Sequence, residues 1–175
     1  PEHPHKEQAG NIRILRYNFR NRYLFTLLAV FPIWRHAKNC DLVHTTSYNA
    51  ALPAFLGAWL RRKKTIVTFH EVWSGLWFRL PFMSGFGSRL HWLFEQMLLR
   101  LPFGKFVGVS RFTADALRAA GVPPEKVCTI LNGIDYQDFM KKGTSTDSTR
   151  SAVSTSPETT FTYTFFGRLG VSKGL

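Results

Sequence analysis

The chain has 175 residues, 45% hydrophobic and 19% charged, which suits one folded domain with a sizeable core and excludes an intrinsically disordered polypeptide. Its 23 Lys and Arg outnumber 11 Asp and Glu, and the net charge of +12 suits nucleic acid, anionic lipid headgroups or phosphorylated substrates. No zinc-ligand spacing, basic zipper or RNA-binding motif favours nucleic acid, so the charge alone leaves the partner open.

The cysteines and the apolar runs indicate the cellular compartment and whether a helix crosses a membrane. Cys40 and Cys128 follow no motif, so a reducing compartment is the default expectation. The longest apolar run, 23–34, is shorter than the ~20 residues that span a bilayer, and no transmembrane helix is predicted. No acidic residue lies between Glu7 and Asp41, whereas six basic residues do.

Strands and helices are predicted to alternate along the chain. Strands are expected at 12–16, 42–46, 65–69, 105–109 and 127–131. Helices are expected at 20–38 with a break at Pro32, at 48–60 with Ser47 as N-cap, at 88–101, and from Ser110 as N-cap to Gly121. Strands separated by helix-length segments indicate βαβ units, a parallel sheet and therefore an α/β fold.

A long aromatic segment, 71–87, precedes the helix at 88–101. It is interpreted either as an ordered lid on its own domain or as a membrane-facing or lipid-acceptor surface. Trp92 and Leu99 are expected on the outer face of the helix, next to Glu95, where they would extend such a surface. Six apolar residues are expected on its core face: Leu90, Leu93, Phe94, Met97, Leu98 and Leu101.

The last part of the chain changes in composition. Residues 141–160 are polar and rich in Ser and Thr, which is typical of a linker. A new strand is expected at 161–166, followed by a turn with Gly167, Arg168 and Lys173. Cations at a turn between a strand and a helix suit a diphosphate, although a solvated turn with two surface cations is the alternative.

Several short motifs follow one another in a fixed order. They are Val109-Ser110, G-V-P-P-E-K-V at 121–127, I-L-N-G-I-D at 130–135, Phe139, and G-R-L-G-V-S-K-G at 167–174. This order resembles the core pattern of glycosyltransferase family 4. The segments 41–44 and 65–71 are similar to that family's acceptor-side strands, so the resemblance covers roughly residues 41–175.

The resemblance implies a GT-B fold, in which two Rossmann-like domains close over the donor. Residues 1–140 would form the acceptor-side domain, incomplete at its N-terminus, and 141–160 the linker. Residues 161–175 would be the first strand and turn of a truncated donor-side domain. The family's glycine-rich first strand would precede the chain and its paired glutamates would follow it, so the chain alone is expected to be inactive.

The implied activity is retaining transfer of a sugar, of the hexosyltransferase type, from a nucleotide-diphosphate donor. No metal and no further cofactor are expected. Arg168 and Lys173, with Gly167, match the family residues that bind the donor diphosphate, where fixed cations stabilise the charge of the leaving group. His70 matches the family's catalytic histidine, which approaches the transferred sugar; the alternative is a hydrogen-bonded structural histidine at a strand end.

Three further residues end predicted strands. Ser110 and Asn132 are weak cleft candidates, since Ser110 also fits a helix cap and Asn132 a left-handed turn before Gly133. His44 is interpreted as structural, because the residues after it lead directly into a helix.

The expected partners are a nucleotide sugar and a sugar or lipid-linked acceptor of cell-envelope biosynthesis, without nucleic acid. The expected location is the cytoplasm, with peripheral contact at the inner face of the membrane. One alternative is a non-catalytic sugar- or partner-binding relative that lacks the acidic pair. The other is a basic nucleic-acid-binding protein, which would bind with a steep salt dependence.

Overall fold

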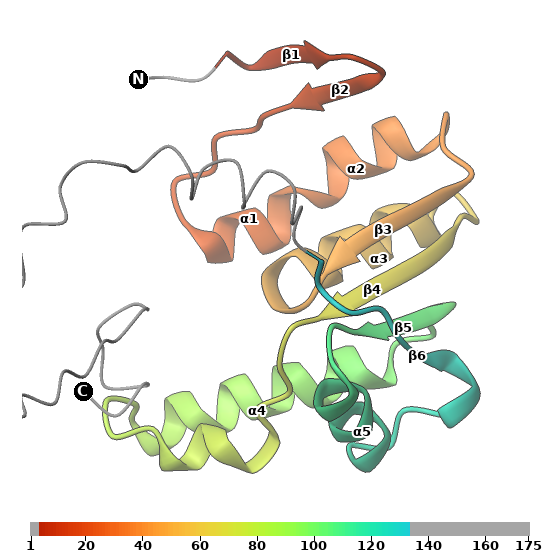
Figure 1. The fold of residues 1–175 in the computed structure, drawn as a ribbon. Helices are drawn as coiled ribbons and strands as arrows, with labels where there is room; N and C mark the ends of the chain where they lie inside the picture. The colour runs from red at the N-terminus through yellow and green to blue at the C-terminus, as the bar shows by residue number, and fades with distance from the viewer. Residues whose placement is uncertain (1–3, 134–175) are drawn as a thin grey trace, which may run out of the picture. The chain divides into compact units, whose positions relative to one another are not determined.

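A four-stranded parallel sheet lies at the centre of the computed structural model, which describes residues 4–133. The strands, in spatial order, are β3 Leu42–Thr46, β4 Lys64–Phe69, β5 Lys105–Gly108 and β6 Val127–Thr129 (Figure 1). Thr46 pairs with Thr68, and Phe69 pairs with Gly108, so the carboxyl ends of the strands are aligned at one edge. The α/β class with a parallel, Rossmann-like sheet is confirmed.

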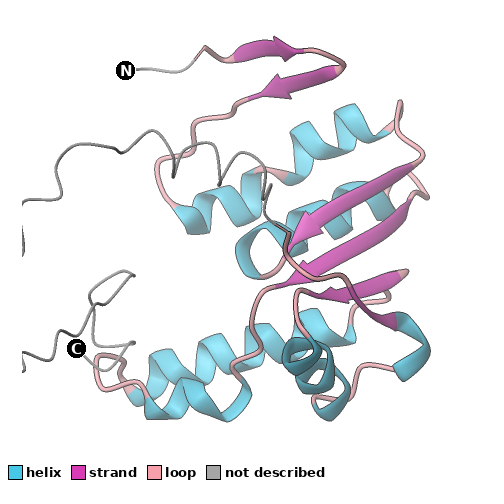
Figure 2. Ribbon diagram, viewed as in Figure 1, coloured by secondary structure: helices cyan, strands magenta, loops and turns pink. Residues whose placement is uncertain are grey.

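Helical segments connect the strands, as parallel pairing requires (Figure 2). Their bounds are α1 Arg22–Leu28, α2 Val30–Ala37, η1 Tyr48–Ala50, α3 Ala51–Trp59, η2 Ser74–Arg79, α4 Gly85–Arg100, α5 Arg111–Ala119 and η3 Pro124–Lys126. Residues up to Leu131 form one compact unit.

The core lies between the sheet and helices α3, α4 and α5. Along β4, Val67 and Phe69 are fully buried, as the β-branched and aromatic composition predicts. The Phe103 ring packs edge-on against Phe55 and Phe106, with centroids 5.2 and 5.5 Å apart. This packing fixes the sheet and therefore the position of its carboxyl edge.

Helix α5 follows β5 closely because two small features allow it. A Cβ on Gly108 would lie 2.7 Å from the Ala114 nitrogen, so only glycine permits this approach. The Ser110 hydroxyl accepts a hydrogen bond from Thr113 N–H at 3.0 Å, which confirms Ser110 as the N-cap. The helix ends before Gly121, whose φ of +94° is in the left-handed region.

The predicted helix at 20–38 is interrupted three residues before Pro32, not at it. Helix α1 ends at Leu28 and α2 begins at Val30, so Pro32 lies in the first turn of α2. A proline ring there would clash with the carbonyl of Leu28 in one continuous helix. The helix is instead interrupted at Ala29. Pro32 then lies in the first turn of α2, where a backbone N–H would have no helical acceptor in any case.

The predicted strand at 12–16 forms, but not in the parallel sheet. It is β2 Ile12–Leu15, and it pairs antiparallel with β1 Lys6–Ala9, which the sequence did not reveal. Gly10 makes the connecting turn with φ +57°, and Arg16 forms an ion pair of 2.7 Å with Glu7.

The start of the predicted helix at 48–60 is also corrected. Ser47 occupies the N-cap position, but its side chain makes no capping hydrogen bond. The first turn is the 3₁₀ segment η1, and Tyr48 adopts a left-handed φ of +62°. A tyrosine disfavours this conformation, so contacts elsewhere must hold it.

The predicted faces of α4 are confirmed only in part: Leu98 is fully buried, and Phe94 and Leu101 pack against the core. Leu90 and Leu93, expected in the core, are 55% and 57% exposed, whereas Glu95 and Leu99, expected outside, are 0% and 5% exposed. Trp92 is half-buried. A hydrophobic pattern assigns carboxylates to solvent, but four hydrogen-bond donors surround Glu95 and compensate its burial.

The predicted start of α4 is wrong. The helix begins at Gly85 rather than at residue 88, because Ser84 is its N-cap. The Ser84 hydroxyl accepts from Gly87 N–H at 3.1 Å.

Candidate functional site

His70 lies at the carboxyl edge of the sheet, directly after β4. Its neighbour Phe69 is fully buried, and the Phe69 carbonyl accepts from Val109 N–H at 3.2 Å, which ties the ends of β4 and β5 together. The His70 side chain itself is exposed. Ligands of open α/β sheets bind beyond this edge, so His70 is placed where a substrate would approach.

Thr113 of α5 connects two residues that the sequence singled out. Its hydroxyl lies 3.0 Å from the Ser110 hydroxyl and donates to the His70 backbone carbonyl at 3.2 Å. Ser110 and His70 are therefore brought together at one edge of the sheet. Sequence reasoning missed Thr113, because nothing local indicates that it reaches a residue 43 positions earlier.

The segment after His70 folds back onto α4 through buried polar contacts. The Glu95 carboxylate accepts hydrogen bonds from Trp73 N–H, Ser74 N–H and the Trp77 indole N–H. It also accepts from the Tyr48 hydroxyl. Burial, together with the nearby Glu95 charge, raises the pKa of the Tyr48 hydroxyl far above its ordinary value, so this hydroxyl remains a donor.

The aromatic segment divides into inner and outer side chains. Trp73 and Trp77 are partly buried, and their rings stack with centroids 5.2 Å apart. By contrast, Phe78, Phe82 and Phe86 are exposed. The inner rings have the packing of an ordered lid, whereas the outer rings present an apolar surface.

An apolar hollow of about 300 Å³ lies between α1 and α4. Its lining comes from α1, from the start of the β3–α3 connection and from the outward face of α4: Tyr23, Thr26, Leu27, Asn49, Leu52, Leu90, His91 and Phe94. Leu90 and Phe94, which the sequence assigned to the core face of α4, thus line an open hollow.

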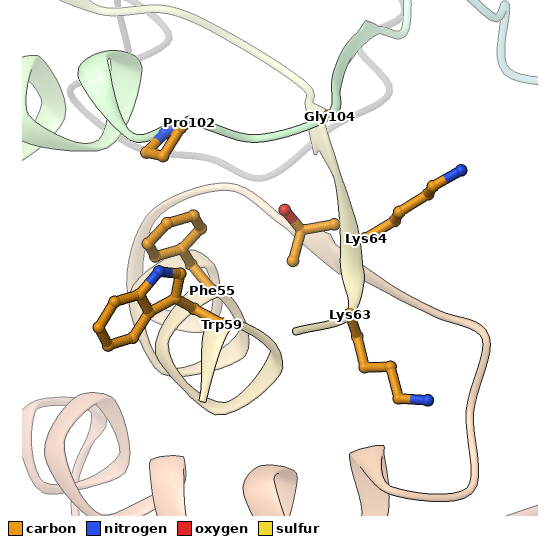
Figure 3. A pocket seen from close by; sticks show the side chains of 7 residues that line it. Phe55, Trp59, Lys63, Lys64, Pro102 and Gly104 are labelled. Carbon is orange, nitrogen blue, oxygen red and sulfur yellow. The ribbon is translucent and has the colours of Figure 1, made fainter. Parts of the chain in front are cut away.

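A second hollow, of about 220 Å³, lies at the opposite edge of the sheet (Figure 3). Phe55 and Trp59 of α3 line it, with Gly104 and the start of β4. Figure 3 shows Lys63 and Lys64 pointing away from the two rings. It borders the amino ends of the strands, where α/β folds do not place their substrates, and it is not the candidate site.

His44 and Asn132 are the other predicted residues that the structure describes. The His44 ring lies 2.8 Å from the Thr68 hydroxyl on the neighbouring strand, a contact that suits a structural histidine. Asn132 is exposed and begins a second unit of the chain. The predicted donor residues lie outside the described residues: Gly167, Arg168 and Lys173.

Among residues 4–133, no group of three His, Cys, Asp or Glu side chains could hold a metal ion. None of the helices in this part of the chain is both long and apolar enough to cross a bilayer.

Most of the chain matches a known protein family. Residues 1–138 match the family described as Glycosyltransferase Family 4. The match includes β4 with His70 and α5 with Ser110. No curated protein matches the chain.

Proposed function

The chain belongs to glycosyltransferase family 4, and on that premise we propose that it is the acceptor-side part of a retaining glycosyltransferase. The reaction moves a sugar, of the hexosyl type, from a nucleotide diphosphate to an acceptor hydroxyl. The sugar C1 exchanges its bond to the diphosphate for a bond to the acceptor oxygen. The acceptor proton leaves with the diphosphate, and no resident metal or cofactor takes part.

The position of His70 carries this proposal. It is an exposed imidazole at the end of a buried parallel strand, with Ser110 and Thr113 at the same edge. An imidazole both donates and accepts hydrogen bonds, which suits a sugar hydroxyl. In the proposed reaction His70 orients the transferred sugar.

Donor binding is proposed for the turn at 167–174, outside the described residues. Arg168 and Lys173 would contact the diphosphate together with the Gly167 backbone. Negative charge accumulates on the diphosphate as it leaves, so fixed cations stabilise the transition state more than the ground state.

A transfer assay of the full-length protein tests the proposal. Radiolabelled nucleotide sugars would be offered with envelope lipid extracts as acceptors. Because they act on developing charge, Arg168→Ala and Lys173→Ala should each lower kcat about 10²-fold. His70→Ala should lower kcat by a similar order, about 10²-fold, while the free energy of unfolding changes by less than about 1 kcal/mol, because the side chain is exposed.

His44→Ala is the matched control. It removes another exposed histidine near the same sheet and should leave turnover near that of the wild type. A large stability loss in His70→Ala, with turnover per folded molecule preserved, would show that His70 is structural. Absence of sugar transfer by the wild type would contradict the proposed function.

For the acceptor we propose a lipid-linked or cell-envelope molecule, reached by peripheral contact at the cytoplasmic face of the membrane. Two observations support this. The apolar hollow beside Leu90 has a volume of about 300 Å³, which suits part of a lipid chain, and the Phe82 and Phe86 rings are exposed. The stretch 8–40, which includes α1, is basic and lacks acidic residues, as contact with anionic headgroups requires.

A further inference from the structure

Glu95 on α4 is a fully buried carboxylate whose hydrogen bonds have no part in the proposed reaction. Glu95 Oε1 accepts from Trp73 N–H at 2.8 Å and from the Tyr48 hydroxyl at 3.0 Å. Glu95 Oε2 accepts from Ser74 N–H at 2.7 Å and from Trp77 Nε1–H at 3.2 Å. Each carboxylate oxygen therefore binds two donors, a pattern that fixes the orientation of all four.

The four donors belong to two segments that leave the carboxyl edge of the sheet. Tyr48 opens the segment after β3, and its hydroxyl also lies 3.1 Å from the carbonyl oxygen of Glu71. Trp73, Ser74 and Trp77 belong to the segment after β4, which begins at His70. Glu95 thus joins both segments to α4.

Two residues of this network have an unusual backbone. Tyr48 and Ser74 adopt φ values of +62° and +43°, in the region that glycine favours. Such outliers persist only where surrounding contacts over-determine them, and they cluster at ligand sites. Core filling does not need them, because an apolar side chain at position 95 could be buried without constraining either backbone. The network therefore serves conformation rather than packing.

The same network fixes a wall of aromatic rings. The Trp77 ring, held through its indole N–H, stacks on Trp73 and lies 5.0 Å from the His91 ring. Tyr48 meets Trp77 edge-on at 6.1 Å. The network reaches the residue directly after His70, because the Tyr48 hydroxyl also contacts the Glu71 carbonyl oxygen, so the conformation held by Glu95 constrains the backbone next to the candidate site.

We infer that Glu95 is a positioning residue for sugar transfer. It holds segment 71–77 in one conformation, so that the wall beside His70 is already formed when the acceptor binds. The inference rests on the proposed function and adds a residue that touches no substrate itself. Preorganisation removes the entropy of ordering from the binding step, so its loss should weaken acceptor binding.

The test compares Glu95→Gln with the wild type in the full-length protein. The amide keeps the shape of the side chain, but its NH₂ group faces two of the four donors. Amide hydrogen exchange in peptides spanning 71–79 should accelerate at least about tenfold, because two backbone N–H groups depend on Glu95. The acceptor KM should rise about tenfold while the donor KM changes by less than about twofold.

Glu125→Gln is the matched control, since it makes the same chemical change at an exposed carboxylate far along the chain. It should leave exchange and both KM values unchanged. If Glu95→Gln does not fold, Tyr48→Phe removes a single donor and should raise the acceptor KM about threefold. That variant keeps the ring and the other three hydrogen bonds.

The outcomes separate the two proposals. Unchanged exchange at 71–79 in Glu95→Gln overturns the inference, because the carboxylate then does not hold the segment. Faster exchange with an unchanged acceptor KM also overturns it, since Glu95 would be structural only. Absence of sugar transfer by the wild type overturns the proposed function and with it the substrate role of Glu95.

Discussion

Helices α4 and α5 use their side chains in opposite ways. In α5, Ala114 and Leu117 face the core and Arg118 faces solvent, as the hydrophobic pattern predicts. In α4, the Glu95 carboxylate is buried together with Leu98 and Leu99, whereas Leu90 and Leu93 face solvent. The difference supports the two tasks proposed for α4: its inner face orients polar groups near the candidate site, and its outer face contacts an apolar partner.

The comparison is tested most severely by replacing the inward carboxylate with an apolar side chain. Glu95→Leu leaves two backbone N–H groups, an indole N–H and a hydroxyl without their acceptor. Each unpaired buried donor costs about 1–3 kcal/mol, so the free energy of unfolding should fall by about 4 kcal/mol. Urea unfolding followed by circular dichroism measures this loss.

Leu117→Ala in α5 is the corresponding change on an ordinary helix. Leu117 is fully buried, and the cavity should lower the free energy of unfolding by about 3 kcal/mol. If Glu95→Leu were as stable as the wild type, the carboxylate would not organise the inner face of α4.

Smaller losses of stability are expected at the N-caps of α4 and α5, and they show whether the two helices also differ at their ends. Ser110 and Ser84 each accept one backbone N–H, at 3.0 and 3.1 Å. Ser110→Ala and Ser84→Ala should therefore each destabilise the protein by about 1 kcal/mol in the same urea measurement. Clearly unequal losses would mean that the contrast between α4 and α5 extends beyond their faces.

The smallest effect on stability should accompany a clear effect on membrane binding. Leu90→Ser/Leu93→Ser should change the free energy of unfolding by less than about 0.5 kcal/mol, because both side chains are exposed. Co-sedimentation with anionic vesicles should weaken about tenfold, since less apolar surface is buried. Binding should also decrease with salt, because the cations are screened.

Phe112→Ser on α5 is the control for this experiment. Phe112 is 82% exposed, yet it is an isolated ring rather than part of the α1–α4 hollow. It should leave vesicle binding unchanged. Membrane contact is wrong if wild-type protein does not bind anionic vesicles at low salt, and the leucines are irrelevant if the double variant binds equally.

The sequence predicted the elements whose determinants are local. Strands β3 to β6 begin and end within two residues of their expected bounds, because runs of β-branched and aromatic residues mark buried strands. The N-cap at Ser110 was also predicted, because a serine directly before a helix is a local signal. His70 was chosen because it matches the family's strand-end histidine, and its exposure at the sheet edge does not test its role.

The features that were missed depend on distant partners. Burial of Glu95 requires donors up to 47 residues away, and Thr113 reaches His70 across 43 residues. No pattern of period 3.6 contains such information. The donor turn, the linker and the domain bounds at 140 and 160 lie outside the described residues and stay predictions.

The left-handed backbone of Tyr48 has a consequence for the order of folding. Its φ of +62° is unfavourable in an isolated segment, and the hydroxyl that compensates it bonds to Glu95, 47 residues later. The chain must close that long loop before the hydrogen bond to Glu95 can stabilise the corner after β3. Because this hydrogen bond closes so long a loop, we expect Tyr48 to take its native conformation late, after the rate-limiting step. The wall beside His70 would then be completed only once α4 has docked.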